Sequence, residues 1–144
     1  MPPDVVLVPM VLADRTRAWV LATICTVASV AGVKLAAIAD ANAEAAGEIA
    51  AALQAEKLVF LTDVMGIMGN PADEDTLLST VHVGEVNELI EDGTIGGGMI
   101  PKVGACVKSV KAGVRKTHII DGRIPHSMLL EFFTDEGIGT QIVQ

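Results

Sequence analysis

Lys57-Leu58-Val59-Phe60-Leu61-Thr62 is a continuous apolar strand pattern, and Asp63-Val64-Met65-Gly66 follows it directly. A strand that is apolar at successive positions is typical of a parallel sheet covered by helices on both faces. In such open sheets, ligands bind at the carboxyl ends of the strands, which is where Asp63 stands. The stretch therefore predicts a buried strand that delivers an acidic side chain to a ligand-binding edge.

Helical and extended patterns alternate along the chain around this strand. An α/β fold is therefore expected, a three-layer sandwich with a mostly parallel sheet between helix layers. The expected strands are Asp4–Pro9, Lys57–Thr62, Thr117–Gly122 with its turn, and Gln141–Val143. The expected helices are Asn42–Gln54, His82–Glu91, Pro101–Ala112 and Ile124–Phe133, with a polar loop at Asn70–Asp75 between the first two.

The first of these helices has a clear apolar stripe. Its buried side is expected to comprise Ala45, Ile49, Ala52 and Leu53. Gly47 in its middle costs about 1 kcal/mol relative to alanine, which close packing against a strand would explain.

Composition restricts the class of protein. The chain has 144 residues, of which 51% are hydrophobic, so it forms one domain with a core and is not disordered. Its net charge of −8 argues against a general nucleic-acid binder, although local charge still permits ATP binding.

Cysteines and histidines show no ligand spacing, so no metal site is predicted. Cys25 and Cys106 lie in apolar surroundings and are expected to be buried free thiols. Ala18–Val33 is an uncharged run of 16 residues, shorter than the roughly 20 needed to cross a bilayer. A buried helix is favoured for it, with a membrane segment as the alternative, and a cytoplasmic location is expected.

A second informative stretch is Gly96-Gly97-Gly98-Met99-Ile100-Pro101-Lys102. Glycines allow a ligand to approach the backbone closely, and Pro101 suits the first turn of a helix. The free N–H groups of that turn, together with the helix dipole, favour an anion, to which Lys102 adds a full positive charge. The stretch indicates a phosphate site, and the alternative is a glycine-rich turn before an ordinary surface helix.

Five motifs resemble the carboxyl-terminal half of the acetylglutamate kinase family, in the amino acid kinase superfamily, in order and spacing. They are Ala46–Ala50, Leu61–Ile67, Gly97–Lys102, Ile119–Arg123 and Thr134–Thr140. The resemblance assigns residues 39–144 to the ATP-binding half of that family and leaves 1–38 as an atypical segment. It implies transfer of the ATP γ-phosphoryl group to the side-chain carboxylate of N-acetyl-L-glutamate, in arginine biosynthesis. Mg²⁺ would accompany ATP, held largely by phosphate oxygens and water.

The resemblance also implies roles for individual residues. Lys102 corresponds to the lysine that stabilises the transferred phosphoryl group, and the arginine-binding positions of feedback-inhibited members match His118, Glu131 and Gly137. The expected nucleotide contacts are Asp63, Val64, Gly66, Ile67, Thr94, Ile95 and Gly96.

Simpler interpretations exist for some of these residues. Asp63 could have a purely structural role, as the cap of the turn at the end of its strand. His118 could be an ordinary strand histidine and Glu131 a solvated helix residue. A separate resemblance concerns the Asn70–Asp75 loop, which is similar to the corresponding loop of plant and cyanobacterial family members. Some of those members bind the PII signalling protein.

The chain departs from the family in two places. No segment before Lys34 resembles the family's amino-terminal half, which carries further glycine loops, another lysine and most of the acetylglutamate pocket. The family's Asn-x-Asn-Ala-Asp stretch falls, without a gap, on alanines at 39, 41 and 43. With a shift of one residue, Asn42 would hold substrate and Glu44 would take the catalytic aspartate's place. Because a displacement of about 1 Å can cost about a hundredfold in rate, little or no turnover is expected.

Three functional hypotheses follow. The chain is an ATP-binding part of an acetylglutamate kinase, a non-catalytic nucleotide-binding or interaction module, or a fragment without activity. The partners expected are ATP, with N-acetyl-L-glutamate and arginine as further ligands, and a second copy or a full-length homologue. The location would be the plastid stroma if the source is a photosynthetic eukaryote.

Overall fold

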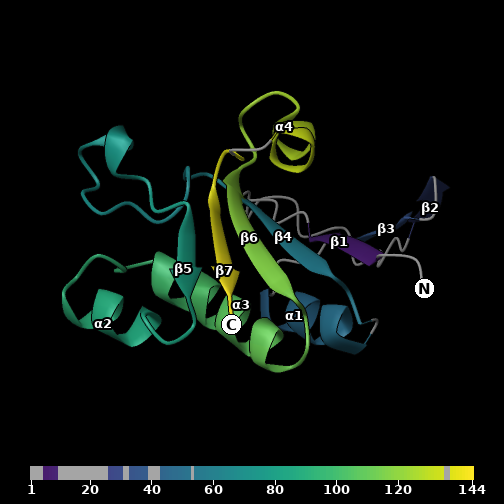
Figure 1. Cartoon of the computed structure of the whole chain (residues 1–144), viewed down its shortest axis with the longest axis horizontal. Coiled ribbons are helices and arrows are strands. Elements are labelled where there is room, and N and C mark those ends of the chain that lie inside the picture. The colour runs from purple at the N-terminus through teal and green to yellow at the C-terminus, as the bar shows by residue number, and fades with distance from the viewer. Residues whose placement is uncertain (1–4, 10–25, 31–32, 39–42, 53, 135–136) are drawn as a thin grey trace, which may run out of the picture.

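The computed structural model describes residues 5–9, 26–30, 33–38, 43–52, 54–134 and 137–144 (Figure 1). Within these ranges, one seven-stranded sheet has the order β2-β3-β1-β4-β6-β7-β5. Its strands are Val5–Pro9 (β1), Thr26–Val30 (β2), Val33–Ile38 (β3), Lys57–Thr62 (β4), Thr80–His82 (β5), Lys116–Asp121 (β6) and Thr140–Val143 (β7). The helices are Ala43–Ala52 (α1), Val86–Glu91 (α2), Met99–Lys111 (α3) and Ser127–Phe133 (α4), with a 3-10 turn at Glu74–Thr76 (η1).

Strand β4 lies at the centre of the sheet. The neighbouring strands β3, β1, β4 and β6 all run parallel to one another. Leu58, Val59 and Phe60 of β4 are at most 1% exposed, so side chains on both faces of the strand are covered. The mostly parallel sheet predicted from this apolar strand is confirmed.

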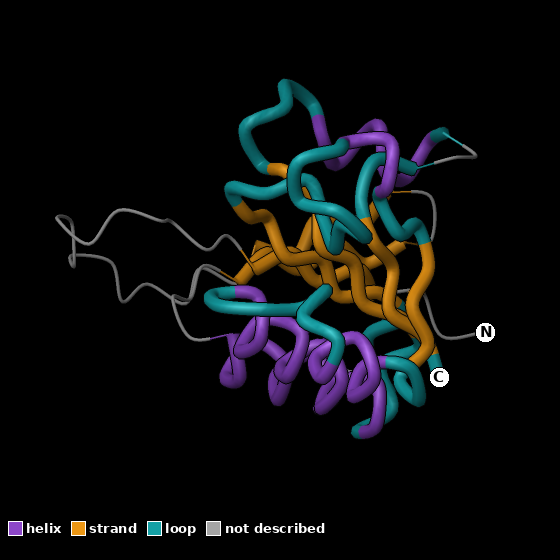
Figure 2. Tube along the Cα trace, turned by 90° about the vertical axis from the view of Figure 1, so that its left-hand side faces the viewer, coloured by secondary structure: helices purple, strands orange, loops and turns teal. Residues whose placement is uncertain are grey.

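Helices cover both faces of the sheet. Helices α1, α2 and α3 form a layer on one side, while α4 and several loops lie on the other (Figures 1 and 2). Alternate residues of β6 face the two layers: Ile119 belongs to the core with α3, whereas His118 bonds to Glu131 of α4. The predicted α/β three-layer sandwich is therefore confirmed.

Strand β7 runs antiparallel to β6, and β5 pairs in parallel with β7. The direction follows from the position of α4, which lies beyond the carboxyl end of β6 (Figure 1). Because the chain re-enters the sheet from the end at which it left, it must run back along β6.

The prediction of a buried helix for Ala18–Val33 is wrong for the part of this run that the structure describes. Thr26–Val30 forms strand β2 and pairs antiparallel with β3, which begins at Val33. β-Branched residues such as Thr26, Val27 and Val30 favour strands, and cross-strand pairing decides between the two structures. Residues 18–25, Cys25 included, lie outside the described residues. In the part of the chain that is described, no helix is long and apolar enough to span a membrane.

Helix boundaries also differ from prediction. The helix expected to reach Gln54 ends at Ala52, and Gln54 has a left-handed φ of +52°. The helix expected from His82 begins only at Val86, because residues 80–82 pair with β7 as strand β5. The helix expected from Ile124 begins at Ser127, and the one expected from Pro101 begins two residues earlier, at Met99.

The buried side of α1 differs from the predicted stripe. Ala46 and Ala50 are fully buried, while Ala52 is exposed and Ile49 is half-buried. Gly47 packs against helix α3 and not against a strand, because a Cβ at this position would overlap the hydroxyl of Ser109. The glycine lets two helices approach closely.

Candidate functional site

Lys102 and Asp63 meet at the carboxyl end of the parallel sheet. Asp63 directly follows β4, and Lys102 lies in the first turn of α3. The Lys102 ammonium is 3.4 Å from the Asp63 carboxylate, whose side chain is 64% exposed against 29% for the lysine. The pKa of Asp63 is lowered, first by its own backbone amide and then by the Lys102 ammonium. The fold thus places one cation and one anion, both accessible, at the ligand-binding edge.

The glycine turn before α3 is open to ligands, but its donors differ from those expected. The N–H groups of Met99 and Ile100 already donate to the carbonyls of Gly96 and Gly97, and Pro101 has none. Within the described residues, the N–H groups of Gly97 and Gly98 donate to no acceptor. A Cβ at either glycine would meet nothing within 4 Å, and Gly97 has a φ of +53°. An anion near Lys102 would therefore meet glycine amides and not the first-turn amides of the helix.

The loop after β4 is held by Thr140 of β7. The Thr140 hydroxyl accepts the N–H of Ile67 at 2.8 Å, and a Cβ on Gly66 would overlap that hydroxyl. Thr62 fixes the other end of the loop by accepting the N–H of Val64. Ile67 is 2% exposed and belongs to the core, and its carbonyl accepts the N–H of Leu78, so both of its backbone polar groups already have partners.

Thr94, Ile95 and Gly96 form the turn that leads from α2 into α3. The Thr94 N–H is capped by the carboxylate of Asp92, and the Ile95 N–H donates to the carbonyl of Leu89 at 2.7 Å. The Ile95 side chain is 1% exposed and packs in the core. This segment is rigidly placed, with Gly96 as its exposed member.

His118, Glu131 and Gly137 lie together in a second cluster. The Glu131 carboxylate contacts His118 Nδ1 at 2.5 Å and accepts the N–H of Ile138 at 2.8 Å. A Cβ on Gly137 would stand 3.0 Å from the same carboxylate. Burial raises the pKa of Glu131, but the His118 contact and the backbone amides outweigh it, and the pKa is lowered overall. The cluster ties α4 and the start of β7 to β6, so the simple interpretation of Glu131 as a solvated residue is wrong.

Asp121 and Arg123, which were not predicted individually as site residues, lie at the same edge of the sheet as Asp63. Asp121 ends β6 beside the end of β4, and its buried carboxylate forms an ion pair with the exposed guanidinium of Arg123 at 2.7 Å. The sequence did offer a signal for them, because polar residues at the end of the apolar strand Thr117–Ile120 would lie at the same edge as Asp63 if the two strands run parallel.

Asn42 and Glu44 are the predicted substrate-binding and catalytic residues near the start of α1. Asn42 lies outside the described residues, and Glu44 is placed only through its backbone in the first turn of α1. Cys106 is buried, and burial raises the pKa of its thiol to about 12, which makes it an inert core residue. Among the described residues, no three acidic, cysteine or histidine side chains gather as metal ligands would.

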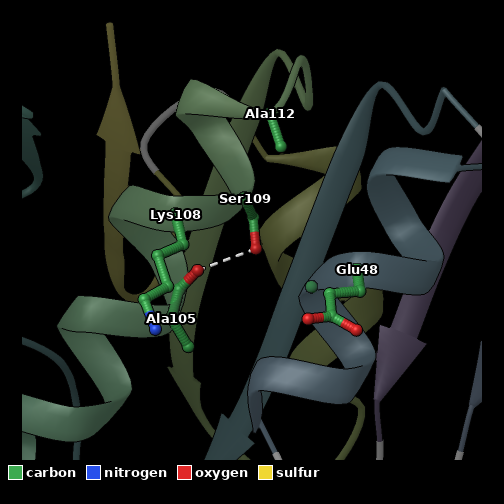
Figure 3. Close-up of a pocket in the computed structure, with 6 residues that line it drawn as sticks. Glu48, Ala105, Lys108, Ser109 and Ala112 are labelled. Atoms are coloured by element: carbon green, nitrogen blue, oxygen red, sulfur yellow. Dashed lines mark hydrogen bonds between the residues drawn. The ribbon is translucent and has the colours of Figure 1, made fainter.

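A hollow of about 160 Å³ lies between α1 and α3 (Figure 3). Ser109, whose hydroxyl donates to the carbonyl of Ala105, points into it, and Glu48 and Lys108 flank it. No predicted site residue lines the hollow. The hollow is therefore not the candidate site.

Known proteins resemble this chain in sequence and in structure. Residues 26–121 match the amino acid kinase family. The chain is 61% identical over 98 residues to an acetylglutamate kinase from Moorella thermoacetica, covering 68% of this chain and 33% of that protein. The N-acetylglutamate synthase from Neisseria gonorrhoeae complexed with coenzyme A and N-acetyl-glutamate matches with a TM-score of 0.65 and 31% identity, over 79% of this chain and 28% of that one. The carbamate kinase from Giardia lamblia bound to AMP-PNP matches with a TM-score of 0.55 and 25% identity, over 81% of this chain and 36% of that one. This chain spans about a third of the length of the curated relatives it matches.

Proposed function

The chain belongs to the amino acid kinase family, and on that basis we propose that it is the ATP-binding part of an acetylglutamate kinase. The reaction is transfer of a phosphoryl group from ATP to the side-chain carboxylate of N-acetyl-L-glutamate. The observation that carries the proposal is the position of Lys102, whose ammonium stands 3.4 Å from Asp63 at the carboxyl edge of the sheet.

The chemistry of phosphoryl transfer suits this arrangement. Such transfer needs positioned groups and cancellation of negative charge, with little covalent chemistry from the protein. Lys102 and the open amides of Gly97 and Gly98 provide positive charge and donors for phosphate oxygens. ATP supplies the transferable phosphoryl group, and Mg²⁺ accompanies it. The two segments proposed to line the nucleotide site contain Asp63, Val64, Gly66 and Ile67, and Thr94, Ile95 and Gly96. Within them, Ile67 and Ile95 are buried and would support the site from the core.

Similar proteins support the same assignment. The acetylglutamate kinase from Moorella thermoacetica shares 61% of the aligned residues. The structurally similar carbamate kinase was solved with AMP-PNP, an analogue of ATP. A cytoplasmic location, and arginine binding at His118, Glu131 and Gly137, belong to the same proposal.

Calorimetric titration with ATP and Mg²⁺ tests nucleotide binding. Lys102→Ala is expected to weaken ATP binding about tenfold or more, because a charge-assisted contact to phosphate is lost. Lys111→Ala is the matched control, since it removes the same charge from the last turn of the same helix, where the residue is exposed. Equal ATP affinity for the wild-type chain and Lys102→Ala would refute the proposed site.

A non-catalytic nucleotide-binding module is the second candidate. Alanines at 39, 41 and 43 favour it, because their side chains can neither hold substrate nor carry charge. An ADP-release assay with N-acetyl-L-glutamate separates the two. Turnover that disappears in Lys102→Ala supports a kinase, whereas ATP binding without ADP release supports the module.

A further inference from the structure

Arg123 leaves the sheet at the same edge as Asp63. Asp121, the last residue of β6, pairs in register with Thr62, the last residue of β4. The N–H of Gly122 then donates to the carbonyl of Thr62 at 2.8 Å. The ends of the two strands are therefore fastened together, and Asp63 and Arg123 follow them at the same edge.

The guanidinium of Arg123 is held in one orientation by Asp121. Its Nε donates to Oδ1 at 2.9 Å, its Nη2 donates to Oδ2 at 2.7 Å, and its backbone N–H also donates to Oδ1. The carboxylate of Asp121 is only 6% exposed, whereas the Arg123 side chain is 68% exposed. A buried anion thus orients an accessible cation, and less conformational entropy remains to be lost when a ligand binds.

The ion pair with Asp121 leaves some N–H donors of the Arg123 guanidinium available. A guanidinium carries five N–H donors in a planar fork, and Asp121 engages only Nε and one hydrogen of Nη2. Over the described ranges, every hydrogen bond of the Arg123 side chain goes to Asp121. Its other donors remain open to a ligand at this edge.

Lys102 and Arg123 act on the same carboxylate. The pKa of Asp63 is lowered first by its own backbone amide, next by Lys102, and further by the charge of Arg123. The contact between Lys102 and Asp63 is long and exposed, and such ion pairs are weak. A polyphosphate, which carries several negative charges, can therefore replace Asp63 as the partner of Lys102 and at the same time accept from the open donors of Arg123.

We propose that Arg123 is a second anion-binding residue of this site, which together with Lys102 binds the polyphosphate of a nucleoside triphosphate. The inference rests on the proposed nucleotide-binding function. Arginine suits this task, because its planar fork pairs with two phosphate oxygens at once. The competing interpretation is that Arg123 only neutralises the buried carboxylate of Asp121.

Calorimetric titration with ATP and with AMP, each with Mg²⁺, distinguishes these interpretations. Arg123→Gln is expected to weaken ATP binding about tenfold and AMP binding by less than about twofold, because only ATP carries the polyphosphate. Arg115→Gln is the matched control. Arg115 precedes β6 at its opposite end and is likewise an exposed arginine with one carboxylate partner, Glu56. It is expected to leave both affinities unchanged.

Each outcome decides the matter. If Arg123→Gln binds ATP as the wild-type chain does, or loses ATP and AMP affinity equally, Arg123 is not a polyphosphate ligand, although the proposed function stands. If the wild-type chain binds no ATP, the proposed function fails and this inference fails with it. Should Arg123→Gln not fold, by circular dichroism, the double variant Asp121→Asn/Arg123→Gln removes the buried charge together with its partner. The same comparison of ATP with AMP then decides.

Discussion

Two side-chain pairs in this molecule, each containing one carboxylate, differ chiefly in burial, and burial gives them different tasks. Lys102 and Asp63 meet loosely in contact with solvent, so either group can turn to a ligand at small cost. His118 and Glu131 meet with side chains 5% and 7% exposed, and the carboxylate also receives a backbone amide. The first pair is suited to binding, while the second holds three segments of the chain together.

The buried pair predicts how stability depends on pH. The pKa of Glu131 lies below its ordinary value of 4.5, so its ionised form stabilises the fold above that pH. The contribution is lost as pH falls through the lowered pKa. Urea unfolding between pH 6 and pH 3 should therefore show a steeper loss of stability for the wild-type chain than for Glu131→Gln. Parallel pH profiles would show that the carboxylate is not linked to folding.

At the scale of elements, the contact between α1 and α3 organises the helix layer. Gly47 permits it, because any larger residue would collide with Ser109. Ser109 is itself buried, and its hydroxyl is satisfied by the carbonyl of Ala105. Since α3 also carries Lys102, the packing of these two helices helps to set the position of the proposed phosphate-binding group.

A pair of glycine substitutions tests this helix contact. Gly47→Ala is expected to destabilise the protein by about 1–3 kcal/mol through overpacking. Gly104→Ala, in the middle of α3, is expected to be neutral or stabilising by up to about 1 kcal/mol, because its Cβ would meet nothing within 4 Å. Chemical denaturation of both variants provides the measurement. Equal effects of the two substitutions would mean that helix propensity, and not packing, governs Gly47.

At the scale of the whole molecule, the carboxyl edge of the sheet unites segments that are distant in sequence. Asp63 follows β4, Arg123 follows β6, and Lys102 comes from the helix between them. Strand β7 supports this edge through Thr140, which holds the loop after β4, and it also links β5 to the rest of the sheet. The last strand of the chain therefore stabilises both the candidate site and an edge of the fold.

Truncating Ile142 tests this role of β7. Ile142 is fully buried, so Ile142→Ala is expected to cost about 2–5 kcal/mol and to speed amide exchange in β5, residues 80–82. Leu129→Ala removes a comparable side chain that is 55% exposed, and it should change stability by no more than about 0.5 kcal/mol. Denaturation and hydrogen–deuterium exchange measure these effects. Unchanged exchange in β5 would show that β5 does not depend on β7.

Local patterns in the sequence were enough to predict the centre of the fold. The run Leu58–Leu61 is apolar on both sides, which suits only a strand covered by two layers, and β4 is that strand. Gly96–Lys102 combines turn residues, a helix start and a lysine, and a helix begins there with Lys102 in its first turn. Such signals act within a few residues of one another, so they can be recognised without knowing the partners in space.

Long-range contacts determined the rest, because several segments have no local preference strong enough to choose their structure. The uncharged run containing Thr26–Val30 fits a helix or a strand, and pairing with β3 made it a strand. Val81 is buried in a strand that joins the sheet through β7, and Gly47 is needed because Ser109 approaches it. Likewise, Arg123 and Asp63 share one edge of the sheet because β4 and β6 pair in parallel, and the paired residues, from Lys57 with Lys116 to Thr62 with Asp121, are 59 positions apart in the sequence. Hydrophobic burial and strand pairing between distant segments, which no sequence window contains, settled each of these cases.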